Sequence, residues 1–160
     1  MFGASGFASA ATISEAESND SLSSAQAVAV PSEGLTISGA VGNSAGDATT
    51  DADFYSFDAT EGDTPQIQIV GALKRDATGT CAGFPALIAL YDSMGNVSAM
   101  GDAECETGME PHIFNSTLPT TGKYYVVVSG YPHWADQDGV LQNMEYATPG
   151  GTYQLVISGV

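Results

Sequence analysis

Two short acidic runs hold the residues of this sequence that are best suited to binding chemistry. The first run is Glu15-Ala16-Glu17-Ser18-Asn19-Asp20, and the second is Asp51-Ala52-Asp53, which leads into the aromatic segment Phe54-Tyr55-Ser56-Phe57. Residues two apart in an extended chain point to the same side, so Asp51 and Asp53 can face one point. Like charges so placed repel each other, and a divalent cation relieves the repulsion. We therefore predict that the two runs converge on one Ca²⁺.

The side chains that most hydrolytic enzymes need are scarce. A Ser/His/Asp or Cys/His enzyme requires a base beside its nucleophile, and only His112 and His133 are available. The chain contains neither a G-x-S-x-G nor an H-E-x-x-H motif. Paired carboxylates can also hydrolyse glycosides, but a bound cation accounts better for carboxylates that are clustered. We therefore expect that the protein is not an enzyme.

The charge balance excludes several classes of partner. The 160 residues include 19 Asp and Glu but only 3 Lys and Arg, which gives a formal net charge of -16. Nucleic acids and anionic membrane surfaces are bound through Lys and Arg, so neither is an expected partner. No run of about 20 apolar residues is present, and we expect no membrane insertion. The acidity fits a protein that takes up cations or lives at high salt, although solubility alone is a sufficient reason for most single carboxylates.

Short apolar segments separated by Gly, Asp and Pro turns predict an all-β fold. We expect strands over 35–41, 53–59, 66–73, 86–91, 97–100, 112–118, 123–129 and 152–158. The continuous apolar run at 86–91 predicts a strand buried on both faces, and Phe54 and Phe57 are expected to reach the core. No segment has the period of an amphipathic helix. The pattern therefore predicts a single antiparallel β-sandwich, jelly-roll-like, of eight or nine strands.

The first twelve residues, MFGASGFASAAT, are small and apolar. Ala8-Ser9-Ala10 resembles a signal-peptidase cleavage site, which indicates secretion. The alternative is an extended N-terminal arm that packs on a neighbouring subunit. We therefore divide the chain into a signal-peptide remnant or arm at 1–12 and one sandwich domain at 13–160.

Two cysteines, Cys81 and Cys105, flank the hairpin predicted over 86–100. An extracellular protein favours a disulfide between them, whereas a cytosolic chain would keep free thiols. Two thiols alone are too few for a structural zinc site. We predict the disulfide, which would tie two loops at the open end of the hairpin and stabilise the fold by about 3 kcal/mol.

Three aromatic residues, Tyr131, Trp134 and Tyr146, fall in predicted loops near the end of the chain. Exposed aromatic side chains often mark a binding patch for sugar or peptide. The alternative is that these side chains cap one end of the sandwich. They are therefore candidate ligand-binding residues.

Six segments occur in an order that resembles a known family. They are E-x-E-x-N-D, a Gly-led strand, D-x-D-F-Y-x-F, LIALYDSMGN, GKYYVVVSG and GTYQLVISG. This order resembles the bacterial pre-peptidase C-terminal (PPC) domain family, which includes the collagen-binding domains of clostridial collagenases. The resemblance runs over residues 15–160. It implies a jelly-roll β-sandwich, secretion and a non-catalytic accessory role, and in the collagen-binding branch it implies Ca²⁺ held between the N-terminal segment and the sandwich.

Matched by position, the resemblance implies six calcium ligands: Glu15, Glu17, Asn19, Asp20, Asp51 and Asp53. All of them offer hard oxygen atoms and none offers sulfur or imidazole, which suits Ca²⁺ rather than Zn²⁺ or Cu²⁺. Ca²⁺ takes about six to eight oxygens, so backbone carbonyls or water would complete the shell. The alternative is that the first run is a solvated acidic leader without a metal.

The sequence leaves several functions open. The first is a secreted, non-catalytic, calcium-binding module for an extracellular matrix protein or polysaccharide. The second is a structural subunit of an extracellular fibre or matrix, whose N-terminal arm adds a strand to the sheet of another copy. The third is an accessory or chaperone-like domain cut from a secreted protease. The strand after Gly122 lacks the later aromatic residue of collagenase-type domains, which present exposed aromatic side chains to collagen. The sequence therefore does not identify the ligand.

Overall fold

The computed structural model describes residues 10–42, 51–104, 107–142 and 150–160. The elements are β1 (Ala11–Ser14), the 3₁₀ turn η1 (Leu22–Ser24), β2 (Gln26–Ala27), β3 (Leu35–Val41), β4 (Asp53–Ala59), β5 (Gln66–Val70), β6 (Leu73–Arg75), β7 (Cys81–Gly83), β8 (Ala86–Tyr91), β9 (Val97–Asp102), β10 (His112–Ile113), β11 (Gly122–Gly130), β12 (Trp134–Ala135), β13 (Leu141–Gln142) and β14 (Gly151–Ser158).

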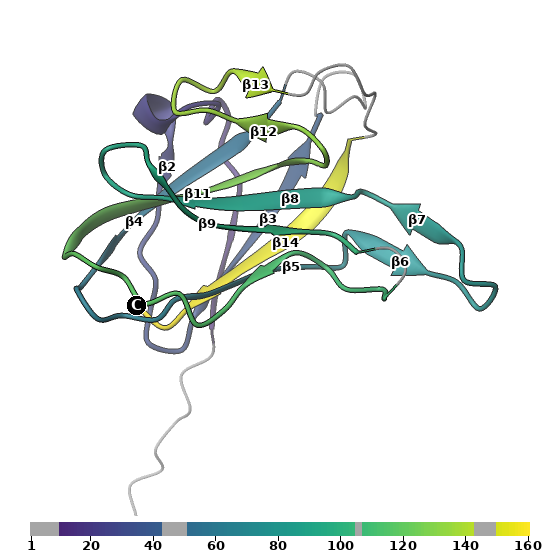
Figure 1. Cartoon of the computed structure of the whole chain (residues 1–160), viewed down its shortest axis with the longest axis horizontal. Helices are drawn as coiled ribbons and strands as arrows, with labels where there is room; N and C mark the ends of the chain where they lie inside the picture. Colours follow the sequence, from purple (N-terminus) through teal and green to yellow (C-terminus); the bar gives the residue numbers. More distant parts are fainter. Residues whose placement is uncertain (1–9, 43–50, 105–106, 143–149) are drawn as a thin grey trace, which may run out of the picture.

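Two five-stranded sheets form a sandwich, with the hairpins β6–β7 and β12–β13 at its margins (Figure 1). Sheet 1 has the strand order β1-β3-β14-β5-β10, and sheet 2 has the order β2-β4-β11-β8-β9. Alternation along the strands builds the core between them. In β14, for example, Tyr153, Leu155 and Ile157 are buried, whereas Thr152 and Gln154 are exposed. Every second side chain of a strand points to the same face, so the inward residues of both sheets join in one cluster.

The central strands of sheet 2, β4, β11 and β8, are buried on both faces. All of β8 is buried, as the continuous apolar run predicted. Ile88 joins the main core, whereas Tyr91 lies in a second cluster on the other face of the sheet. Phe57 and Phe54 are both buried as expected, but Phe57 belongs to the main core and Phe54 to the second cluster. Partly buried residues of η1 and β13 cover that cluster.

The structure confirms the predicted all-β sandwich but differs in detail. The described residues form fourteen strands rather than eight or nine, partly because the hairpins β6–β7 and β12–β13, the second of which holds Trp134, lie where loops were predicted. The strand expected over 112–118 ends after β10, because Asn115 has a φ of 60°, which lies outside extended conformation. β1 falls in a segment that was not predicted as a strand, and it pairs in parallel with β3. β2 also pairs in parallel with β4, so the sheets are not wholly antiparallel. Within the described residues, no helix is long and apolar enough to cross a membrane.

Three predictions fall partly outside the described residues. Cys81 lies in β7 and is not a free cysteine, but its predicted partner, Cys105, is not among the described residues, so the disulfide stays a prediction. Tyr146 also lies outside them. The segment predicted as a signal remnant or arm is described only from Ala10 onward, and the predicted boundary after residue 12 falls within β1.

Three hairpins close with the same turn, D-x-x-G-x, at residues 76–80, 92–96 and 136–140. In each turn the aspartate Oδ1 accepts hydrogen bonds of 2.8–3.0 Å from the backbone N–H groups two and four residues further on. The glycines have φ values of 79–86°, a conformation that residues with a Cβ rarely adopt. These short-range hydrogen bonds set the turns of β6–β7, β8–β9 and β12–β13.

The last of these turns packs directly on the N-terminal segment. The backbone N–H of Leu22 donates to the carbonyl oxygen of Gln137 at 3.2 Å. A Cβ atom at Gly139 would lie 1.8 Å from the carbonyl oxygen of Asp20, which is closer than two such atoms can approach. The missing side chain at Gly139 therefore lets the N-terminal segment and the hairpin meet.

We expect Gly139→Ala to lower the free energy of unfolding more than Gly62→Ala does. Both glycines have a positive φ, at which alanine costs about 1–2 kcal/mol. A Cβ at Gly62 would meet nothing within 4 Å, so only Gly139→Ala adds a backbone clash. Thermal unfolding followed by circular dichroism measures both variants. Equal losses of stability would contradict the contact between the hairpin turn and the N-terminal segment.

Candidate metal centre

The N-terminal segment crosses from one sheet to the other. It enters as β1, at the edge of sheet 1 beside β3, and it leaves as β2, at the edge of sheet 2 beside β4. We call residues 15–25, between these two strands, the crossing segment. Because it runs from the β3 edge to the β4 edge, it carries the first acidic run past the beginning of β4, where the second run lies.

Backbone hydrogen bonds fix the crossing segment against both sheets. The N–H of Glu15 donates to the carbonyl oxygen of Ser38 in β3 at 2.9 Å. The carbonyl oxygen of Asn19 accepts from the N–H of Phe54 in β4 at 2.8 Å. These two backbone bonds tie the acidic run to both sheets.

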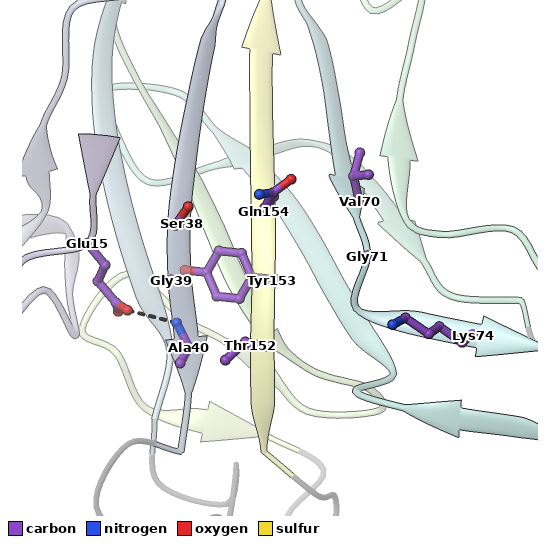
Figure 2. Close-up of a pocket in the computed structure, with 10 residues that line it drawn as sticks. All are labelled: Glu15, Ser38, Gly39, Ala40, Val70, Gly71, Lys74, Thr152, Tyr153 and Gln154. Carbon is purple, nitrogen blue, oxygen red and sulfur yellow. Dashed lines mark hydrogen bonds between the residues drawn. The ribbon is translucent and has the colours of Figure 1, made fainter. Parts of the chain in front are cut away.

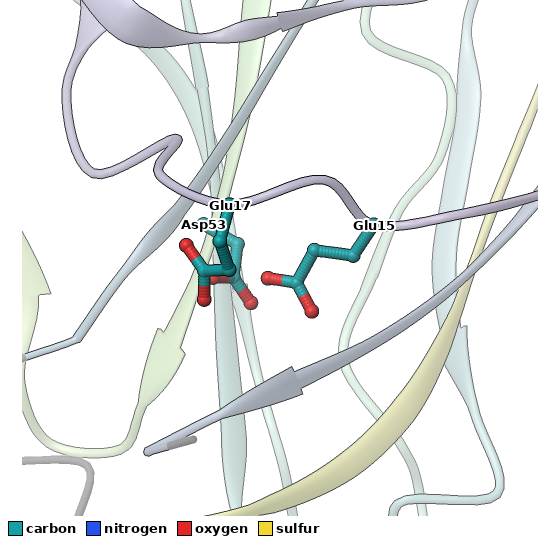
Figure 3. Close-up of side chains that lie close together, drawn as sticks. All are labelled: Glu15, Glu17 and Asp53. Atoms are coloured by element: carbon teal, nitrogen blue, oxygen red, sulfur yellow. The ribbon is translucent and has the colours of Figure 1, made fainter. Parts of the chain in front are cut away.

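All five predicted carboxylate ligands come together at this crossing. One oxygen each from Glu15, Glu17 and Asp53 lies within 4.8 Å of the others, and Figure 3 shows these three side chains directed toward one another. The same spacing holds for Glu17, Asp20 and Asp51, so Glu17 connects the two groups. Oxygens bound to one Ca²⁺ at about 2.3–2.6 Å lie within about 5 Å of each other. The spacing fits a hard cation, and the binding of one stays a prediction.

Several buried polar atoms in the site have no hydrogen-bond partner among the described residues. Asn19 is completely buried, yet neither its Oδ1 nor its Nδ2 is paired. Oδ1 of Asp53 and Oε1 of Glu15 are also buried without a hydrogen-bond partner. Each unsatisfied buried atom costs about 1–3 kcal/mol. Their grouping at one place indicates a bound species that satisfies them, either ordered water or a cation.

Asp53 is also the end of a hydrogen-bonded chain inside the sandwich. The hydroxyl of Tyr153 donates to Oδ2 of Asp53 at 2.6 Å, and the hydroxyls of Tyr55 and Tyr153 lie 2.7 Å apart. Tyr153 reaches Asp53 across Gly39 of β3, where a Cβ atom would come within 2.5 Å of the tyrosine hydroxyl. Glycine at this position therefore makes room for the ring. The chain holds one oxygen of Asp53 and leaves the other for a different partner.

Burial is the main reason that the pKa of Asp53 is raised to about 10. The close approach of the Glu15 carboxyl group and the negative charges of Glu15 and Asp51 raise this pKa further, whereas the hydrogen bond from Tyr153 lowers it. Burial also raises the pKa values of Tyr55 and Tyr153. Without a cation, Asp53 therefore keeps its proton at neutral pH. A cation held beside it would favour the ionised form.

A hollow of about 640 Å³ lies over the outer face of sheet 1, next to the acidic residues (Figure 2). Small and polar side chains of β3 and β14 line its floor, and Lys74 stands at its far side. Glu15 lines the same hollow, and its Oε2 accepts a hydrogen bond from the N–H of Ala40 at 2.8 Å. Glu15 is thus shared between the hollow and the first carboxylate group.

The aromatic residues predicted to bind a ligand lie elsewhere. Tyr131 is 44% exposed, directly after β11, and Trp134 is 39% exposed, in the short hairpin β12–β13. Neither belongs to the acidic groups or lines the hollow. Their part in binding stays a prediction.

Two elements of the site were not predicted from the sequence. Tyr153 was placed in the last strand and Gly39 in the strand over 35–41, but nothing in their local sequence indicated that they meet Asp53. A tyrosine at a buried position needs a partner for its hydroxyl. The pattern that would have indicated this contact is a glycine paired with a buried tyrosine on the neighbouring strand, close to a buried Asp.

Comparison with solved structures identifies the fold. A scan of protein-family models and a search of curated proteins each find no match. The pre-peptidase C-terminal domain of a collagenase from Bacillus anthracis matches at 21% identity and a TM-score of 0.50, over 84% of this chain and 94% of that domain. A periplasmic inhibitor of g-type lysozyme, PliG from Salmonella Typhimurium, matches at 18% identity and a TM-score of 0.46, over 83% and 97% of the two chains. The first likeness shows that this chain has a PPC-like β-sandwich fold.

We expect the stability of the cation-free protein to fall as the pH rises from 5 to 9. The native state holds a proton on Asp53 up to a pH of about 10, whereas the unfolded state loses it near the ordinary pKa of 3.8. The native state binds more protons in this range, so the contribution of Asp53 falls by up to about 1.4 kcal/mol per pH unit. Melting temperatures in the presence of a chelator measure the slope. Asp53→Asn cannot titrate, so it should flatten the slope; an unchanged slope would contradict the buried, protonated carboxyl group.

Proposed function

We propose that this protein is a secreted, non-catalytic, calcium-binding module of the PPC kind, which binds an extracellular protein or polysaccharide. The observation that carries the proposal is the group of unsatisfied buried atoms at Glu15, Asn19 and Asp53, beside two further carboxylate-bearing residues of the crossing segment. A solvated acidic leader has no need to bury an asparagine whose amide is unpaired. A hard cation accounts for both the burial and the clustering.

The donor set supports calcium over other metals. The six predicted ligands offer carboxylate and amide oxygens, and the two histidines and the described cysteine are not among the acidic groups. Hard oxygen ligands from several flexible side chains suit Ca²⁺, whereas Mg²⁺ requires a more regular octahedron and keeps more of its water. When bound, the cation would supply positive charge to carboxylates that otherwise repel one another. Glu15, Glu17 and Asp20 would then hold the crossing segment against Asp51 and Asp53 of the sandwich.

The hollow on sheet 1 is the place we assign to the partner. It lies over an open sheet face with a floor of small side chains, and Glu15 connects it to the acidic groups. Fixing the carboxylate of Glu15 on a cation would also fix this wall of the hollow. Binding of an extracellular ligand would then depend on calcium.

The alternative, a fibre subunit that assembles through its N-terminal arm, stays a hypothesis. Residues 1–9 lie outside the described part of the chain. The neighbouring strand β1 pairs with β3 of its own chain, so the described residues offer no specific support for exchange with another copy.

We expect Ca²⁺ to raise the melting temperature relative to the protein in EGTA. With a Kd of about 10⁻⁴ M and about 10 mM Ca²⁺, binding to the native state adds about 2.7 kcal/mol, which corresponds to about 5–10 °C in a chain of this size. Glu17→Gln should abolish most of this increase, because Glu17 belongs to both carboxylate groups and is exposed, so its replacement leaves the packing intact. Scanning calorimetry with and without Ca²⁺ measures both.

Asp102→Asn is the matched control, since Asp102 is an exposed carboxylate in β9 that belongs to neither group. It should keep the full increase, and Mg²⁺ should give a smaller one. Equal melting temperatures in Ca²⁺ and EGTA would contradict the proposal. So would the same increase in all three proteins, because it would reflect general screening of the net negative charge.

A further inference from the structure

Three of the five asparagines in this chain begin an N-x-[ST] sequence. They are Asn19-Asp20-Ser21, Asn96-Val97-Ser98 and Asn115-Ser116-Thr117. In secreted proteins this tripeptide is the acceptor for N-linked glycans, and it is used where the chain is exposed in a loop. The structure separates the three tripeptides by burial and by the hydrogen bonding of the asparagine.

Two of the asparagines are poor acceptors. Asn19 is completely buried within the acidic groups of the crossing segment. Asn96 closes the turn between β8 and β9, where its Nδ2 donates to both carboxylate oxygens of Asp92, at 3.3 and 3.0 Å. The two residues after it belong to β9, which is paired along β8. An enzyme that binds the tripeptide would have to break this turn and the beginning of the hairpin.

Asn115 is neither buried, as Asn19 is, nor hydrogen-bonded within a hairpin turn, as Asn96 is. It is exposed, and so is Thr117, in the irregular segment between β10 and β11. Its φ of 60° turns the chain away from the sheet, and no side-chain hydrogen bond of Asn115 is found within the described residues. The residue before it, Phe114, is 42% exposed and stacks on the ring of His112, with 4.7 Å between the ring centroids. An exposed aromatic surface of this kind suits the C–H face of a sugar ring.

We propose that Asn115 carries an N-linked glycan and that Asn19 and Asn96 do not. In the reaction, Nδ2 of Asn115 forms a bond to C1 of the first sugar of a lipid-phosphate-linked oligosaccharide. The C1–O bond to the phosphate breaks, the lipid phosphate leaves with the electron pair, and Nδ2 gives up one proton. The inference rests on the proposed secretion, but it is independent of calcium.

Mass spectrometry of the protein recovered from its native source tests the assignment directly. Removal of glycans with a peptide-N-glycosidase converts a modified asparagine to aspartate, which marks the site. We expect this conversion in the peptide that contains Asn115 and in neither of the other two. An unmodified Asn115, or a glycan on Asn19 or Asn96, would overturn the proposal.

Variants of the folded, purified protein test whether the structure selects the site. The protein is incubated with an oligosaccharyltransferase that recognises N-x-[ST] and its lipid-linked oligosaccharide, and the intact mass is measured. Asn115→Gln and Thr117→Ala should each lose the single glycan, because each removes one half of the same tripeptide. Ser98→Ala and Ser21→Ala remove the other two tripeptides and should keep it. A glycan that persists in Asn115→Gln, or a native chain that takes up none under conditions that modify a control glycoprotein, would contradict the inference.

The calcium-dependent change in melting temperature is measured on Thr117→Ala as well. This residue is exposed and remote in sequence from both acidic runs, so the change should be the same as in the native protein. Loss of the glycan with the calcium effect retained separates this inference from the calcium proposal.

Discussion

Asp53 places an ionisable carboxyl group inside a β-sandwich, between the hydroxyl of Tyr153 on one side and Glu15 on the other. Burial makes the charge expensive, and the nearest ionisable neighbours are acids that make it more so. A proton or a cation resolves this conflict, and the choice between them depends on pH and on the ions in solution. The two hydrogen-bonded tyrosines, and the glycine that makes room for Tyr153, are arranged around this single carboxyl group.

The repulsion among these carboxyl groups also affects the segment that joins the two sheets. The crossing segment enters beside β3 and leaves beside β4, so it connects the edges of both sheets on one side of the sandwich. Its backbone is held by hydrogen bonds to β3 and β4, and its other end is held by the turn of the β12–β13 hairpin. The carboxylates that repel Asp51 and oppose the ionisation of Asp53 are therefore on a segment that cannot move away without breaking these contacts. Their repulsion acts on the native state, and any group that neutralises it stabilises the junction of the sheets.

The surface features of the molecule are distributed over different elements. The hollow lies across β3 and β14 and shares Glu15 with the acidic site, so a ligand bound there would respond to the state of the carboxylates. Asn115 follows β10, at the edge of sheet 1 opposite to β1. A glycan there would leave the edge strand that carries the crossing segment uncovered. The proposed ion site and the hollow therefore meet at Glu15, whereas the proposed glycan site lies at the opposite edge of sheet 1.

The sequence by itself determined the fold class, because the alternation of apolar residues and the Gly, Asp and Pro turns are local signals that strands and hairpins obey. The burial of β8 on both faces followed from its composition alone. The acidic residues could also be selected in advance, since Asp51 and Asp53 are two apart in a strand entrance. That residues 15–20 lie against them was also predicted, but only the tertiary structure shows how the contact is made, through the parallel pairing of β1 and β2 with β3 and β4. Likewise, burial makes Asn19 a poor glycan acceptor, and burial is a property of the packed molecule that no tripeptide encodes.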